Sequence, residues 1–170
     1  LIGSSVLRRI NKNKSVKKLV CYDNNKSVCE IIKKKNLSSN LATSPVEAVK
    51  NSDLILISIP LSSFENLINS IKDNLKPGSI LMDTCSVKTG VDNIVKKLKI
   101  KNSTWIPGHP VAGTENSGPN AGFSDLFQDR WTILTPDKNV KDSEIKKATL
   151  FWESMGCLLY TSDAADDRIC

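Results

Sequence analysis

The chain has 170 residues, of which 39% are hydrophobic and 25% charged, a composition ordinary for one soluble globular domain. No apolar run approaches the roughly 20 residues that a membrane span needs, and no signal-peptide pattern opens the chain, so we expect a cytoplasmic protein with no membrane partner. The five cysteines show no Cys-x-x-Cys spacing, which argues against a zinc site and for a reducing compartment.

The net charge of +6 raises the question of a nucleic-acid partner. The lysine runs, however, fall at the ends of expected helices, where cations suit the helix dipole. Aromatic residues make up only 5% of the chain and do not alternate with the lysines. We therefore expect no nucleic-acid partner, and an anionic small-molecule substrate instead.

Strand and helix patterns alternate along the chain. The continuous apolar run of residues 54–59 is typical of a strand buried on both faces of a parallel sheet. The order of elements predicts an α/β fold, a doubly wound and mostly parallel sheet with helices on both faces. In chain order we expect helices near residues 2–10, 28–32, 45–50, 64–75, 91–98 and 145–155, and strands over 16–22, 41–42, 54–59, 79–82, 104–106 and 131–134.

Polar residues follow several of the expected strands. In a doubly wound sheet, ligands bind where the carboxyl ends of the strands meet, so these residues mark one candidate site. They are Asp23, Ser58, residues 84–86 and His109.

The N-terminal residues 1–5 resemble the tail of a glycine-rich phosphate turn. Gly3 would be its third glycine, and the first helix would point its N-terminus at a pyrophosphate. Asp23 lies 20 residues after Gly3, where a ribose-binding acid belongs. An aspartate at a strand end is also commonly a turn residue or a helix cap, so both interpretations of Asp23 stay open.

His109 is the only histidine, and it lies between Gly108 and Pro110. Histidine is the usual general acid or base near neutral pH, and its neighbours restrain the backbone while allowing a ligand to approach. A lone histidine is also commonly a surface or core residue, which is the alternative here.

Four segments together resemble the nucleotide-binding domain of the prephenate and arogenate (cyclohexadienyl) dehydrogenases. The most distinctive is the run Gly-His-Pro-Val-Ala-Gly-Thr-Glu, followed by a Ser-Gly pair. The resemblance extends to about residue 157 and implies a Rossmann-like domain. The segments are residues 1–5, 83–88, 108–123 and 130–136.

The resemblance also implies the reaction, an oxidative decarboxylation of prephenate or arogenate with hydride transfer to NAD. We expect NAD rather than NADP, because Asp23 would repel a 2′-phosphate and the next residues, Asn24 and Asn25, are neutral. His109 would accept the proton of the ring hydroxyl, and Ser86 would hydrogen-bond that hydroxyl. Glu115 would order or gate the substrate pocket, which Thr114 would line. Ser86 has an alternative role as the N-cap of the following helix, and Glu115 as a solvated loop acid.

For the cofactor, the resemblance assigns the adenosine ribose to Asp23 and the passage over the dinucleotide to the loop 58–60. A purely structural role for Pro60 would be to end the strand. The expected cofactor-binding residues are Ile2, Gly3, Asp23, Ser58 and Pro60.

The family pattern also includes parts that this sequence does not show. A first strand with two earlier glycines and a helical C-terminal domain that forms a homodimer are expected outside it, so we expect the chain alone to be inactive. Residues 158–170 resemble translated adapter sequence, and we expect the domain to end at residue 157. Two functional alternatives remain, another NAD(P)-dependent hydroxy-acid dehydrogenase and a non-catalytic dinucleotide-binding domain.

Overall fold

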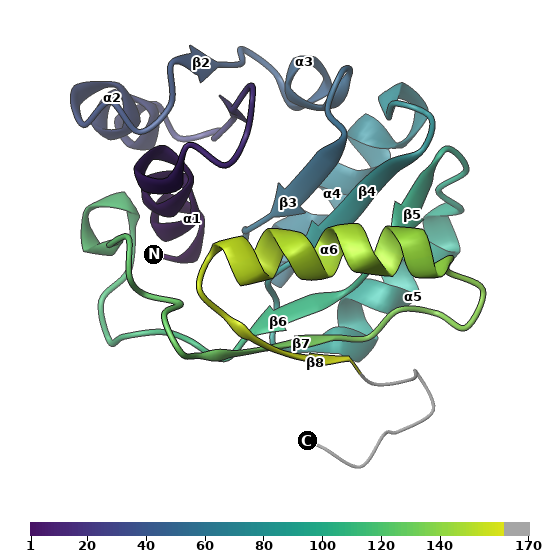
Figure 1. The fold of residues 1–170 in the computed structure, drawn as a ribbon. Helices are drawn as coiled ribbons and strands as arrows, with labels where there is room; N and C mark the ends of the chain where they lie inside the picture. Colours follow the sequence, from purple (N-terminus) through teal and green to yellow (C-terminus); the bar gives the residue numbers. More distant parts are fainter. Residues whose placement is uncertain (162–170) are drawn as a thin grey trace.

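The computed structural model describes residues 1–161. Helices and strands alternate as expected, and Figure 1 shows α6 covering one face of the central strands while α4 and α5 cover the other. Among residues 1–161, no helix is long and apolar enough to cross a membrane. The helices are α1 (Ile2–Asn13), α2 (Lys26–Lys34), α3 (Pro45–Val49), α4 (Leu61–Ile71), α5 (Lys88–Leu98) and α6 (Asp142–Ser154). The strands are β1 (Val20–Cys21), β2 (Asn40–Leu41), β3 (Leu54–Ile57), β4 (Ser79–Asp83), β5 (Ser103–Trp105), β6 (Gly108–Pro110), β7 (Trp131–Leu134) and β8 (Leu158–Thr161).

The strands form three hydrogen-bonded groups. Strands β1 and β2 pair in parallel, and β3, β4 and β5 form a second parallel group in that order. In the third group β6 runs antiparallel to β7, and β7 runs parallel to β8. The α/β class and the mainly parallel pairing predicted from the sequence are confirmed, with β6 as the antiparallel exception.

Strand β4 is buried along its whole length and separates two parts of the core. Successive side chains of a strand point to opposite faces, so Leu81 packs with α4 and α5 while Ile80 and Met82 pack with α1 and α6. Trp152 of α6 is fully buried and meets the ring of Phe127 edge to face, with ring centroids 5.7 Å apart. Burial on both faces fixes the position and direction of the strand that leads into the site.

Helix α4 illustrates why the helices form where the sequence predicts them. Phe64, Ile68 and Ile71 recur at helical spacing, and all three are buried against the sheet. The chain then turns through Gly78, whose φ of 77° favours glycine, and enters β4.

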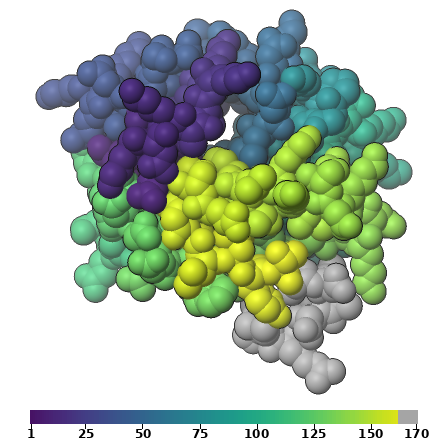
Figure 2. Space-filling view, in the orientation of Figure 1, coloured from purple at the N-terminus to yellow at the C-terminus, as the bar shows by residue number. Residues whose placement is uncertain are grey.

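Helix α1 lies beside the C-terminal elements, as the adjoining purple and yellow surfaces in Figure 2 show. The Asn13 side chain donates a hydrogen bond to the Ser154 carbonyl at 2.7 Å. Val6 and Ile10 share a core cluster with Trp152 and Met155. The first and last helices therefore stabilise each other.

The ends of several elements differ from the sequence predictions. The strand expected over 16–22 is limited to Val20–Cys21, because the preceding residues 16–18 are exposed. The strand expected over 54–59 ends at Ile57. Leu158–Thr161, which belong to the expected non-native tail, pair with β7. The rest of the expected non-native tail, residues 162–170, lies outside the described residues.

The sheet of β6, β7 and β8 has one buried and one outward face. Thr132 and Leu134 of β7 point inward and are fully buried. Trp131 alternates with them, is 52% exposed, and lies level with the exposed Leu158 of β8. Strands β7 and β8 therefore present apolar side chains to solvent on their outward face, and His109 of β6 lies opposite Ile133 on the same face.

Candidate functional site

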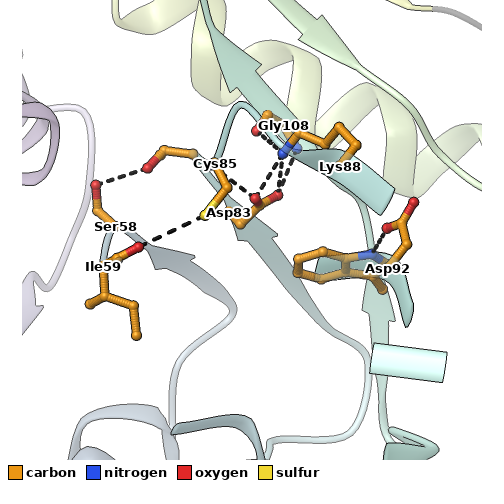
Figure 3. Close-up of polar contacts among 9 residues, drawn as sticks. Ser58, Ile59, Asp83, Cys85, Lys88, Asp92 and Gly108 are labelled. Carbon is orange, nitrogen blue, oxygen red and sulfur yellow. Dashed lines mark hydrogen bonds and ion pairs between the residues drawn. The ribbon is translucent and has the colours of Figure 1, made fainter. Parts of the chain in front are cut away.

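The carboxyl ends of β3 and β4 lie level with each other. Their parallel register pairs Ile57 with Asp83, so the next residues of each strand, Ser58 and Thr84, also come together. Their hydroxyl oxygens are 3.0 Å apart and share a hydrogen bond (Figure 3). The predicted convergence of polar groups at this edge is present for these two strands.

The N-terminus of α1 lies against the end of β3. A Cβ atom added to Gly3 would stand 3.3 Å from the Cβ of Ser58, so a larger residue would push the helix away. The hydroxyl of Ser5 accepts a hydrogen bond from the Phe123 backbone N–H at 3.1 Å, which fastens the loop after β6 to the same helix. Gly3 and Ser58 are therefore neighbours, and Ile2 directly precedes Gly3 at the start of α1, as a phosphate-binding edge requires.

Asp83 ends β4 with a carboxylate that is completely buried. It receives hydrogen bonds from the backbone N–H groups of Cys85 at 2.9 Å and Gly108 at 3.1 Å. The Lys88 ammonium lies 2.8 and 2.7 Å from its two oxygens and also donates to the Gly108 carbonyl (Figure 3). These bonds satisfy both carboxylate oxygens, as a buried charge requires.

His109 is the central residue of β6 and lies opposite Ile133 of β7. Its side chain is half-buried, and its Nδ1 is enclosed without a hydrogen-bond partner among the described residues. Burial lowers the pKa of His109 below its usual 6.5, and the positive charge of Lys88 lowers it further, while Asp83 opposes the shift. The imidazole is therefore mainly neutral near pH 7, which is the form that accepts a proton.

Two other predicted residues are engaged in local hydrogen bonds. One carboxylate oxygen of Asp23 accepts a hydrogen bond from the Asn25 backbone N–H at 2.9 Å. Asp23 therefore has the role of a turn residue, which was one of its two interpretations. The hydroxyl of Thr114 accepts from the Asn116 backbone N–H at 3.2 Å within an exposed loop. Neither contact joins these residues to the cluster around His109.

The remaining predicted residues lie on exposed connections. Ser86 lies in the exposed turn after β4, but Val87 holds the N-cap position of α5 without a side-chain hydrogen bond. The alternative role of Ser86 as a helix cap is therefore wrong. Glu115 is exposed in the loop after β6, and Pro60 is the N-cap of α4 rather than the last residue of β3.

Sequence reasoning gave no role to Asp83 or Lys88. Both lie in the segment 83–88 that carries the resemblance. An acidic residue directly after the apolar run Ile-Leu-Met is a signal for a buried carboxylate, and such a group needs a cationic or donor partner nearby. The partner itself could not be chosen from the several lysines of the sequence.

Comparison with known proteins identifies the family. The family described as "Prephenate dehydrogenase, nucleotide-binding domain" matches residues 6–161. The cyclohexadienyl dehydrogenase of Zymomonas mobilis is 35% identical over 158 residues, covering 92% of this chain and 53% of that protein. The chain thus spans about half the length of this relative.

Solved structures share the fold. The prephenate dehydrogenase of Aquifex aeolicus, described in complex with hydroxyphenyl propionate and NAD+, superposes with a TM-score of 0.84 at 24% identity. That match covers 96% of this chain and 57% of the other. Synechocystis arogenate dehydrogenase superposes with a TM-score of 0.86 at 23% identity, covering 98% and 58% of the two chains. The Rossmann-like fold expected from the sequence is confirmed, and the chain belongs to the prephenate dehydrogenase family, of which it represents the nucleotide-binding domain.

Proposed function

We propose that the protein catalyses the oxidative decarboxylation of prephenate or arogenate with NAD as the hydride acceptor. The observation that carries the proposal is the half-buried, mainly neutral His109, whose neighbour Gly108 is bonded to Asp83 at the carboxyl end of β4. The relatives support it, since their names include cyclohexadienyl, prephenate and arogenate/prephenate dehydrogenases.

The residues of this edge fit a dinucleotide. Gly3 contributes no side chain of its own at the N-terminus of α1 and packs against the small Ser58 side chain, so backbone N–H groups of the helix can face a pyrophosphate. Asp23 has its second carboxylate oxygen free of protein hydrogen bonds among residues 1–161, which leaves it available to ribose hydroxyls. Ile2 and Pro60 would complete the edge on either side.

Bound NAD would supply the hydride acceptor for the ring carbon that bears the hydroxyl group. His109 takes the hydroxyl proton as that carbon becomes a carbonyl carbon, and loss of carbon dioxide then makes the ring aromatic. Because Nδ1 of His109 is enclosed, Nε2 is the nitrogen that receives the proton. Ser86 would hold the same hydroxyl, and Thr114 and Glu115 would order the loop over the substrate.

The test is His109→Asn in the complete gene product, assayed by prephenate- and arogenate-dependent formation of NADH. Loss of a positioned base lowers turnover by about 10²–10⁴-fold. The affinity for NAD, measured by calorimetry, should change by less than about twofold, because the cofactor contacts come from other residues. An equal loss of affinity and turnover would show that His109 is structural.

The proposal includes a homodimer in the cytoplasm. The four cysteines within residues 1–161 are free thiols, as a reducing compartment favours. Light scattering of the complete gene product measures its mass directly, and a monomer at micromolar concentration would contradict the dimer.

A further inference from the structure

The buried ion pair of Asp83 and Lys88 takes no part in the proposed chemistry. The Asp83 side chain is 0% exposed and that of Lys88 is 20% exposed. Breaking such a pair strands a charge in the interior, so its presence requires an explanation. Its contacts point to the peptide unit next to His109.

Both backbone polar groups of Gly108 form hydrogen bonds with this ion pair. Its N–H donates to Oδ1 of Asp83 at 3.1 Å, and its carbonyl accepts from Nζ of Lys88 at 2.5 Å. Gly108 directly precedes His109, so these two bonds fix the backbone from which the imidazole projects.

The way the strands pair explains why these hydrogen bonds to Gly108 matter for the position of β6. Strands β4 and β6 lie in separate hydrogen-bonded groups within residues 1–161, so no ladder joins them. In the described part of the chain, the backbone hydrogen bond from the Ile106 N–H to the Leu81 carbonyl is the last one between this segment and β4, so beyond it the position of β6 relative to the end of β4 depends on side chains. The Asp83–Lys88 pair supplies those contacts.

We propose that Lys88 is a positioning residue for His109, which it holds through Asp83 and the Gly108 carbonyl. The proposal rests on the proposed function, in which His109 is the base. The pair also acts through space, because Lys88 lowers and Asp83 raises the pKa of His109. The register places Ile133 and Tyr160 level with His109 on the neighbouring strands, so no Asp, Glu, Lys or Arg faces it there.

The first experiment titrates His109 by NMR in the 170-residue chain, where a single histidine gives an unambiguous ring signal. Lys88→Gln should raise the pKa of His109, and Asp83→Asn should lower it, because each removes one of two opposing charges. Lys76→Gln is the matched control, since Lys76 pairs with the exposed Asp53 and should leave the titration unchanged.

Lys88→Gln alone leaves the buried carboxylate of Asp83 unpaired, which destabilises the fold, so the double variant with Asp83→Asn is titrated as well. It places a polar side chain of similar size at both positions and removes both charges. Its His109 pKa should exceed that of the unsubstituted chain, because Lys88 is the stronger of the two influences. An unchanged titration in the double variant, or shifts of the two single variants in one direction, would overturn the proposal.

The second experiment measures turnover in the complete gene product. Lys88→Gln should lower kcat by about 10²-fold, the size of effect produced by displacing a reacting group by about 1 Å. The affinity for NAD should stay within about twofold, and Lys88→Arg should restore part of kcat. If the unsubstituted protein turns over neither substrate, the proposed function fails while the NMR titration still decides the role of Lys88.

Discussion

Gly108→Ala tests whether close packing at the end of β4 sets the position of His109. A Cβ atom at Gly108 would stand 3.1 Å from the Asp83 carbonyl oxygen and 3.5 Å from both Leu134 Cδ2 and Trp152 Nε1. The first contact is with backbone, which yields less readily than a flexible side chain. Strand β6 must therefore move outward by a few tenths of an ångström.

That displacement sets the size of the expected effects. Overpacking of this kind costs about 1–3 kcal/mol of unfolding free energy. If a shift of 1 Å costs about 10²-fold in rate, a shift of about 0.3 Å costs roughly fourfold in kcat. Urea denaturation of the 170-residue chain measures the first effect, and steady-state kinetics of the complete gene product measures the second.

Gly113→Ala is the matched control. Its added Cβ would meet no atom within 4 Å, and it lies in the loop directly after β6. We expect its unfolding free energy to stay near that of the unsubstituted chain. If Gly108→Ala is as stable as Gly113→Ala and keeps the kcat of the unsubstituted protein, close packing at Gly108 does not hold β6.

Three further predictions concern pH, the core and the cofactor. Because the pKa of His109 is lowered on folding, the contribution of this residue to stability is complete above pH 6.5 and is lost as the pH falls through the pKa of the folded state. Urea midpoints measured from about pH 8 to pH 5 should show this loss of stability. In His109→Asn, the part of the pH dependence that comes from His109 should be absent. Trp152→Ala should cost about 3–5 kcal/mol by urea denaturation, whereas Trp152→Phe should cost much less, because Nε1 has no hydrogen-bond partner among the described residues; equal costs would contradict this account. Asp23→Ser should weaken the binding of NAD and lower the ratio of kcat/KM with NAD to kcat/KM with NADP, because the carboxylate would both bind the ribose hydroxyls and repel a 2′-phosphate. If that ratio is unchanged, Asp23 does not belong to the cofactor site.

The parallel strands and long helices could be predicted because burial leaves a periodic signal in the sequence. The apolar run ending at Ile57 and the spacing of Phe64, Ile68 and Ile71 require no knowledge of distant residues. The alignment of Ser58 with Thr84 also follows, because parallel strands end at the same edge. The positions of these elements follow from the residues within each element or from the parallel alignment of neighbouring strands.

The parts that escaped prediction depend on contacts between distant segments. The Gly-His-Pro sequence of β6 has no strand propensity, and it is extended because it pairs with β7. Likewise, Leu158–Thr161 become a strand only beside β7. The choice of Lys88 as the partner of Asp83 depends on how α5 leaves the sheet, which five residues of sequence separation do not specify.

The exposed Trp131 on the outward face of the β6–β8 sheet allows binding at this face of the protein to be followed by tryptophan fluorescence. Of its three tryptophans, Trp152 is fully buried, Trp105 is partly buried with its indole N–H bonded to Asp92, and Trp131 is 52% exposed. Collisional quenching of fluorescence by acrylamide should therefore act mainly on Trp131. Trp131 lies two residues from Ile133, the cross-strand neighbour of His109. A molecule that covers this face would therefore shield the indole from acrylamide and reduce the quenching of its fluorescence, without any added label.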